Sequence, residues 1–371
     1  MAIRLRAWLP NVLLVGLGLA FALGLTEGLT RLFFPQPTGL SLQDPYGLPM
    51  HWPGLVRYLP QYGHTVSFNS AGMRDREHAE AREPGVFRIL LLGDSFMEAL
   101  QVPFDSSLPG LLETRLSRES GRRVEVLNAG VSGWGTDDEL RYLTEYGVKY
   151  RPDLVVVAMT LHNDISDNLR EQWHTVKDGT LVDQQVQPIP SFEYRVLRLK
   201  AYLSTRFQIY QLWRRVRQRS EIQQTGQQLT SHVMQLFRIP TSETIARGVN
   251  LTGMLLRQIQ TVSGQFGARV VLVLLPIRNQ LSDSLFAGMF QGANFPPAAL
   301  DIDRPQRMIT PVADSLGIPA IDLLPGFRAW TAYRPEPLYL EWDGHWNEAG
   351  HRLAAEEVTR GLMQAGVFSD P

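Results

Sequence analysis

Hydrophobic and polar residues along this chain form two kinds of segment, short apolar runs and longer stretches with helical spacing. The short runs are nearly free of charge, which is typical of strands buried on both faces of a parallel sheet. The longer stretches repeat apolar residues as amphipathic helices do. The predicted strands are 87–92, 124–127, 154–159, 269–275 and a short one near Ala320; the predicted helices are 106–118, one opening at Thr136, 249–266, 305–316 and 347–363.

This alternation predicts an α/β fold, a three-layer αβα sandwich around a central, mostly parallel sheet. The helix that opens at Thr136 carries a capping-box pattern with Glu139, and acidic residues fill its first turn. Strands and helices of this kind account for residues 85–371, which we expect to form one domain.

The longest apolar stretch, residues 7–26, carries no charge and follows Arg4 and Arg6. A helix of this length is about 30 Å long and can span the hydrocarbon core of a bilayer. The positive-inside rule then places the N-terminus in the cytoplasm and the rest of the chain in the periplasm. A cleaved signal peptide is the alternative, but residues 22–27 make a poor cleavage site. We therefore expect residues 1–30 to be an uncleaved, single-pass membrane anchor.

Two further segments depart from the alternation. Residues 35–60 are rich in proline and glycine, which disfavours regular elements and predicts a tether within a lead-in over 31–84. Residues 169–242 form a basic and aromatic insertion that is predicted to be helical. It could cap the site or contact anionic lipid or polysaccharide, or it could be a helical pair with a solvated charged face. Its basic and aromatic residues are Arg195, Arg198, Lys200, Arg206, Arg214, Arg215, Arg217 and Arg219, interleaved with Tyr194, Tyr202, Phe207, Tyr210 and Trp213.

Composition narrows the possible chemistry. The 36 basic and 37 acidic residues nearly cancel, so no global field points to nucleic acid. The chain has no cysteine, which excludes disulfides, thiolate metal sites and a catalytic cysteine. Neither a nucleotide-binding Gly-x-x-x-x-Gly-Lys loop nor the Gly-x-Ser-x-Gly elbow of α/β-hydrolases is present in the sequence.

A candidate nucleophile, Ser95, follows Gly-Asp directly after the predicted strand 87–92. The carboxyl ends of parallel strands are where an open α/β sheet binds ligands. A serine hydroxyl is a weak nucleophile that needs a base, a group to orient the base, and donors for the oxyanion. Later blocks offer such groups at residues 128–133, 162–164 and 341–351.

These four blocks, in this order over residues 87–362, resemble the SGNH or GDSL hydrolase superfamily, as a membrane-anchored bacterial member. The resemblance implies the flavodoxin-like SGNH fold and an esterase or acyltransferase that uses no metal or cofactor. It implies that Ser95 is the nucleophile and that the backbone N–H groups of Ser95 and Gly133, with the side-chain amide of Asn163, form the oxyanion hole. Gly130 and Gly135 are alternatives to Gly133.

The resemblance also implies that His345 is the general base and that Asp343 orients it. Asp343 stands two residues before His345, whereas the family places its aspartate three before, and Glu341 is the fallback. His162 stands where the family usually has glycine. A zinc site formed by Asp343, His345 and His351 is an alternative with little support.

We therefore expect a serine-dependent ester hydrolase or O-acyltransferase that acts outside the membrane on O-acyl, chiefly O-acetyl, groups of an envelope or exported glycan. Its expected partners are an acylated small molecule or glycan and, through the N-terminal helix, the membrane, with no nucleic acid. The alternatives are a lipid or thioester acyl hydrolase and a non-catalytic, glycan-binding scaffold of the same fold.

Overall fold

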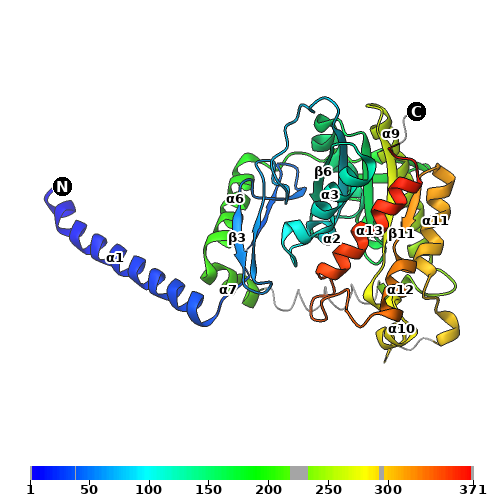
Figure 1. Cartoon of the computed structure of the whole chain (residues 1–371). Coiled ribbons are helices and arrows are strands. Elements are labelled where there is room, and N and C mark those ends of the chain that lie inside the picture. Colours follow the sequence, from blue (N-terminus) through cyan, green and yellow to red (C-terminus); the bar gives the residue numbers. More distant parts are fainter. Residues whose placement is uncertain (1, 38, 218–232, 292–295, 369–371) are drawn as a thin grey trace.

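Five parallel strands form the central sheet of the computed structural model, which describes residues 2–37, 39–217, 233–291 and 296–368 (Figure 1). Their order is β11-β10-β7-β5-β6, which is the flavodoxin-like order, with its switch point between β5 and β7. The sheet confirms the predicted fold class. The strands are β5 Phe87–Gly93, β6 Val124–Gly130, β7 Leu154–Thr160, β10 Arg269–Leu275 and β11 Ala320–Asp322.

Successive side chains of the strands point to opposite faces of the sheet, and each face has its own hydrophobic core. Leu90 and Leu92 of β5 pack in one core and Ile89 and Leu91 in the other. Because helices cover both faces, the predicted three layers are present. The first core is covered by α4 Thr136–Tyr142, α9 Glu243–Gly264 and α11 Arg304–Leu316; the second by α3 Leu108–Ser120, α12 Leu324–Tyr333 and α13 Glu348–Gln364.

The predicted cap of α4 is wrong by one residue. Gly135 is the N-cap, and its N–H donates to Asp138 Oδ2 at 3.1 Å. Thr136 therefore lies inside the helix instead of before it, because Asp138 supplies the capping carboxylate that the prediction assigned to Glu139.

Short helical elements connect these parts of the domain. They are α5 Asp164–Asp167, α10 Asp283–Met289 and the single turns η1 Phe104–Ser106, η2 Leu143–Gly147, η3 Val148–Tyr150, η4 Asn168–Arg170, η5 Arg278–Gln280 and η6 Pro297–Ala299.

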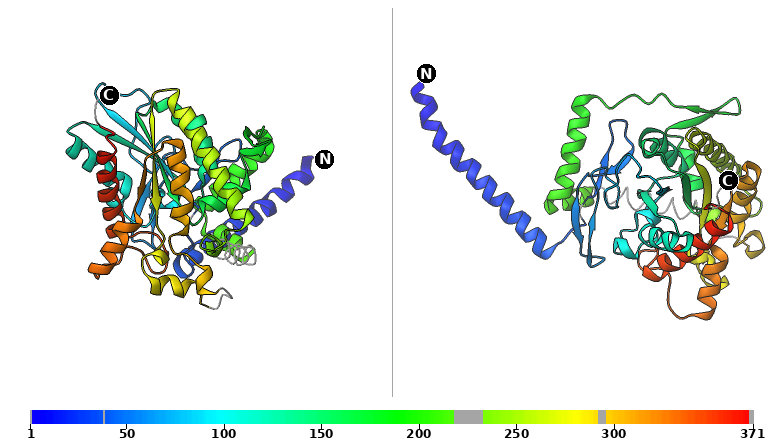
Figure 2. Two further views of the ribbon diagram at one scale, coloured as in Figure 1. Left: turned by 90° about the vertical axis from the view of Figure 1, so that its right-hand side faces the viewer. Right: turned by 45° about the horizontal axis from the view of Figure 1, so that its top comes forward.

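The helix α1 Ala2–Phe33 extends away from the domain (Figures 1 and 2). The most apolar 18-residue window of its segment Pro10–Phe33 has a mean hydropathy of 2.0, and none of that window is buried. By length and composition this helix can cross a membrane, and a signal sequence would have the same properties.

The proline- and glycine-rich lead-in is folded, so the prediction that it lacks regular elements is wrong. It forms two antiparallel hairpins, β1 Ser41–Gln43 with β2 Pro49–His51, and β3 Val56–Leu59 with β4 His64–Ser67. Glycine marks the turn of each hairpin, since Gly47 and Gly63 have φ of 101° and 75°. A positive φ favours glycine because it has no Cβ.

The insertion begins with a hairpin, β8 His174–Lys177 and β9 Thr180–Asp183, and continues as the helices α6 Ser191–Arg206 and α7 Gln208–Arg217. The prediction of helix alone missed this hairpin. Its turn is Asp178-Gly179, and both residues have positive φ, which is the signature of a tight hairpin turn. Arg219, named above among the basic residues, lies outside the described residues.

Candidate active site

Ser95 is the first residue of α2 Ser95–Glu98, a single helical turn directly after β5. Asp94 is the N-cap of α2, and its side chain accepts a hydrogen bond from the Phe96 N–H at 2.9 Å. Gly93 lets the turn close, because a Cβ there would lie 2.4 Å from Met97 Cγ. The hydroxyl of Ser95 is thereby placed at the carboxyl end of a central strand, next to the switch point of the sheet.

His345 lies beside Ser95, with 2.8 Å between its Nε2 atom and Ser95 Oγ. Its Nδ1 atom is hydrogen-bonded to Asp343 Oδ1. Gly344, between the two residues, has a φ of 83° and its N–H donates to Leu340 O at 2.8 Å. This tight turn is why an aspartate only two residues before the histidine can reach it.

The electrostatics of this pair stabilise the charged form of each partner. Burial alone would lower the pKa of His345, but the hydrogen bond to Asp343 and the charge of that carboxylate raise it above its ordinary value. Burial alone would raise the pKa of Asp343, but hydrogen bonds from His345 and Tyr62 hold it below its ordinary value. Asp343 is therefore ionised near neutral pH and stabilises a charged imidazole.

The alternative residues at this end of the chain face elsewhere. Glu341 is exposed and pairs with Arg278 at 3.5 Å. His351 is buried on α13, where its Nδ1 atom accepts the Leu108 N–H at 3.2 Å, and burial lowers its pKa to about 3. Among the described residues, no group of three histidine or acidic side chains is arranged to hold a metal ion.

Three glycines lie at the end of β6 and in the loop that follows it, and their N–H groups differ. Gly130 donates to Asn128 Oδ1 and Gly135 to Asp138 Oδ2, each at 3.1 Å. Within the described part of the chain, no hydrogen bond is formed by the Gly133 N–H. Gly133 is exposed with a φ of 83°, and the space where a Cβ would point is open to 4 Å. Of the three, Gly133 alone offers an N–H to a ligand.

Asn163, the N-cap of α5, directs its amide at two carboxylates. Its Nδ2 atom lies 3.3 Å from Asp94 Oδ2 and 3.2 Å from Asp167 Oδ2. Arg170 links this loop to the neighbouring one, because its Nη2 atom is 3.0 Å from Gly133 O and 3.5 Å from Asp167 Oδ1. The two loops predicted to supply oxyanion donors are therefore connected to each other.

His162 occupies the place of the expected glycine beside the site. Its ring meets Phe96 edge-on at 6.5 Å between centroids, and Phe96 in turn contacts His345 at 4.9 Å. Burial, with the nearby charge of His345, lowers the pKa of His162 to about 4. The ring is therefore neutral at physiological pH.

Tyr62, which sequence reasoning missed, lies at the turn of the β3–β4 hairpin and reaches Asp343. Its hydroxyl donates to Asp343 Oδ2 at 2.5 Å, and its ring stacks on Trp342 at 5.4 Å between centroids. Gln101 also donates to Asp343, with 3.4 Å from Nε2 to Oδ1. Nothing in the local sequence marks Tyr62, because its partner lies 281 residues away.

Glu98, the last residue of α2, joins the helix of Ser95 to the lead-in and to the loop of Gly133. It is buried, and its Oε1 atom is 2.8 Å from His51 Nε2. Its Oε2 atom accepts the Ser132 N–H at 3.0 Å and the hydroxyl of the same serine. Arg74, also buried, donates to Glu98 O at 2.6 Å and Val102 O at 2.5 Å. Hydrogen bonds from His51 and Arg74 of the lead-in therefore hold α2 in place.

Fold and geometry together define an α/β domain with a serine, a histidine and an aspartate aligned at the switch point of a parallel sheet. The model of the GDSL-like lipase/acylhydrolase family matches residues 91–353, more than half of the chain. The chain belongs to this family.

Individual relatives are more distant. An arylesterase of Vibrio mimicus is 30% identical over 118 residues, a match that covers 29% of this chain and 58% of the arylesterase. The chain is also similar to the acetylxylan esterase Axe2 of Geobacillus stearothermophilus, with 14% identity, a TM-score of 0.41, and 74% of this chain and 94% of that chain covered. A crystal structure of TesA gives 16% identity, a TM-score of 0.39, and coverage of 75% and 98%.

Proposed function

We propose that the protein is a serine esterase or O-acyltransferase in which Ser95, His345 and Asp343 form the catalytic triad. The observation that carries this proposal is the continuous chain of hydrogen bonds from Ser95 Oγ through both ring nitrogens of His345 to Asp343. Membership of an acylhydrolase family supports it. The same hydrogen-bonded chain disfavours a non-catalytic scaffold, because binding alone does not require a serine, a histidine and an aspartate in this arrangement.

We propose a task for each residue. Ser95 Oγ attacks the carbonyl carbon of an acyl ester while His345 Nε2 takes the hydroxyl proton. The carbonyl oxygen becomes an oxyanion that the N–H groups of Ser95 and Gly133 stabilise; the Ser95 N–H is among those at a helix N-terminus without an intrahelical acceptor. Asn163 completes the hole once substrate draws its amide from Asp94 and Asp167.

Collapse of this intermediate releases an alcohol, which takes its proton from His345, and leaves an acyl group on Ser95. Water or a sugar hydroxyl then attacks the acyl-enzyme, again with His345 as base. We propose an O-acetylated glycan of the cell envelope as the substrate and the periplasm as the location. The apolar helix α1 supports an envelope location, and the family's chemistry supports an acyl ester.

Labelling with a fluorophosphonate probe tests the assignment of Ser95. The wild-type protein should be labelled and should hydrolyse a short acyl ester such as p-nitrophenyl acetate, and Ser95→Ala should do neither. Ser315→Ala is the matched control, because Ser315 is an exposed serine on α11 whose hydroxyl donates to Val312 O. An unlabelled, inactive wild type that is correctly folded would contradict the proposal.

A further inference from the structure

The helices α6 and α7 are fixed beside the end of α1. The carboxylate of Glu27 accepts the N–H groups of Gln208 and Ile209, each at 3.0 Å, and so caps α7. Arg31 Nη2 donates to Arg206 O at 2.7 Å. Both views of Figure 2 place α6 and α7 next to the C-terminal end of α1. If α1 crosses a bilayer, these helices therefore lie at its surface.

Several large apolar side chains of α6 and α7 are exposed. No side chain of α7 is buried, and Trp213 and Val216 are 52% and 70% exposed. On α6, Phe192 and Leu199 are 78% and 55% exposed. Apolar side chains gathered on one exposed face mark a contact with a membrane or a partner. Here these side chains belong to helices that are bonded to the end of the apolar helix α1, which favours the membrane.

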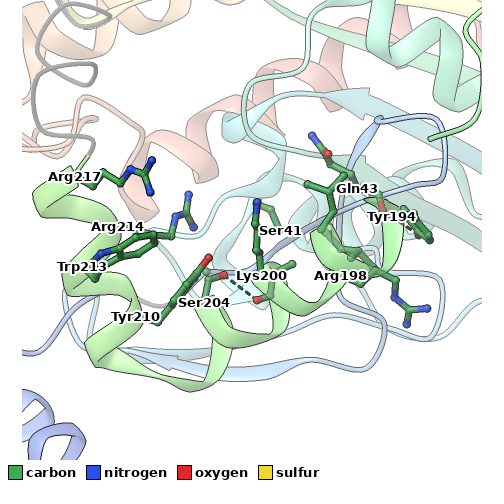
Figure 3. A pocket seen from close by; sticks show the side chains of 14 residues that line it. Ser41, Gln43, Tyr194, Arg198, Lys200, Ser204, Tyr210, Trp213, Arg214 and Arg217 are labelled. Carbon is green, nitrogen blue, oxygen red and sulfur yellow. Dashed lines mark hydrogen bonds between the residues drawn. The ribbon is translucent and has the colours of Figure 1, made fainter. Parts of the chain in front are cut away.

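Basic side chains line a cleft of about 700 Å³ between α6, α7 and β1 (Figure 3). Lys200, Arg214 and Arg217 are among them, and none of the three forms an ion pair with a carboxylate in the described ranges. The Arg217 guanidinium lies over the Trp213 ring at 5.4 Å. Uncompensated cations beside tryptophan and tyrosine are the composition of protein surfaces that bind anionic membranes.

We propose that α6 and α7 bind anionic phospholipid headgroups of the bilayer that holds α1, with the headgroup phosphate in the basic cleft. This inference rests on the membrane location proposed above, and not on the esterase activity. Arg57 of β3 donates to Thr205 O of α6 at 2.8 Å, and the β3–β4 turn carries Tyr62. Lipid binding at α6 therefore holds the hairpin that contacts the triad at a set position above the membrane.

A fluorophore at one position of α7 tests this directly, because the chain contains no cysteine. The full-length Val216→Cys variant, labelled with an environment-sensitive dye, is reconstituted in phosphatidylcholine bilayers with or without phosphatidylglycerol and a headgroup-level quencher. Phosphatidylglycerol should increase the quenching, and this increase should disappear at about 1 M salt, where the Debye length is about 3 Å. Tyr333→Cys, on α12 and 87% exposed, is the control that should stay unquenched.

A second experiment removes positive charge from the cleft. Replacing Lys200, Arg214 and Arg217 by glutamine should lower the ratio of docked to undocked α7 by about a hundredfold, at about fivefold for each cation. The proposal would be overturned if quenching changed neither with phosphatidylglycerol nor with this triple substitution. So would a dye response to soluble polygalacturonate without one to lipid, which would indicate an acidic glycan site. Ester hydrolysis is followed in the same samples: its absence beside an intact lipid response would support the inference and contradict the proposed function.

Discussion

Asp343 is held at both carboxylate oxygens, by His345 and Gln101 at one and by Tyr62 at the other. A carboxylate fixed in this way keeps its orientation toward the imidazole. Hydrogen bonds to ionised groups are roughly twice as strong as neutral ones. Burial, together with the hydrogen bond to Asp343, raises the pKa of Tyr62, so the phenol remains a donor. Tyr62 is a positioning residue that acts through Asp343.

Substitution of Tyr62 by phenylalanine should lower kcat about tenfold and leave KM nearly unchanged, because the change removes one hydrogen bond to a charged group, worth about 1.5 kcal/mol or more. Steady-state hydrolysis of p-nitrophenyl acetate measures both constants. Tyr58→Phe on β3, whose side chain is 56% exposed, is the matched control and should behave as wild type. Equal kcat values for Tyr62→Phe and Tyr58→Phe would contradict the role proposed for Tyr62.

The pH dependence of kcat/KM should report His345, which acts as a base only when its ring is neutral. Because Asp343 raises the pKa of His345, activity should rise through an inflection above the ordinary histidine value of about 6.5. Asp343→Asn should move the inflection to lower pH and reduce kcat by about 10⁴. His162→Gln should leave the inflection in place, because the pKa of His162 is about 4. An inflection that ignores Asp343→Asn would contradict the assigned pair.

At the scale of elements, α2 is a helix of one turn that carries the proposed nucleophile Ser95. Contacts with other segments hold it in place. One turn of helix has little stability of its own, since nucleation is costly. Arg74 donates to the carbonyls of Glu98 and Val102, and to that of Ala99, the residue with a φ of 52° that ends α2. The lead-in thus replaces the hydrogen bonds that a longer helix would supply.

Arg74→Met should therefore destabilise the protein by about 3 kcal/mol, since buried carbonyls lose a charged donor. Chemical denaturation followed by circular dichroism would measure the free energy of unfolding. Arg76→Met, in the same segment but with a half-exposed side chain paired to Glu113, should cost less than 1 kcal/mol. Similar losses in both variants would show that Arg74 has no special part in holding α2.

How far the sequence predicts each element depends on how local its cause is. The strand 269–275 matches β10 residue for residue, and Asn347 is the cap of α13, because buried runs and cap residues act within a few positions. The lead-in hairpins were missed because their prolines and glycines resemble those of a tether. The Tyr62 contact could not be predicted, because only the folded chain brings β3 and β4 to Asp343.

At the scale of the whole molecule, anchor, lead-in, insertion and catalytic domain are one connected structure. The end of α1 caps α7, α6 is bonded to β3, and the β3–β4 turn contacts the triad. A flexible tether would let the site sample many heights above a membrane. These contacts instead favour a fixed height, which suits the envelope substrate that we propose.

The orientation of the chain across the membrane can be measured. Arg4 and Arg6 precede the apolar segment of α1, and the positive-inside rule predicts that they stay in the cytoplasm. The catalytic domain should then lie outside, and the cysteine-free chain allows a single-site test with Arg118→Cys on α3, whose side chain is 70% exposed. A membrane-impermeant maleimide should label this variant in intact spheroplasts as fully as in lysed ones.

Intact-protein mass on the same samples separates an anchor from a signal sequence. Because residues 22–27 make a poor cleavage site, the mass should be that of the whole chain, 41.9 kDa before labelling. Labelling only after lysis would place the domain in the cytoplasm and contradict the orientation. A labelled but shortened chain would keep the orientation and replace the anchor by a signal peptide. Because Glu27 caps α7, cleavage beyond that residue should also loosen the insertion.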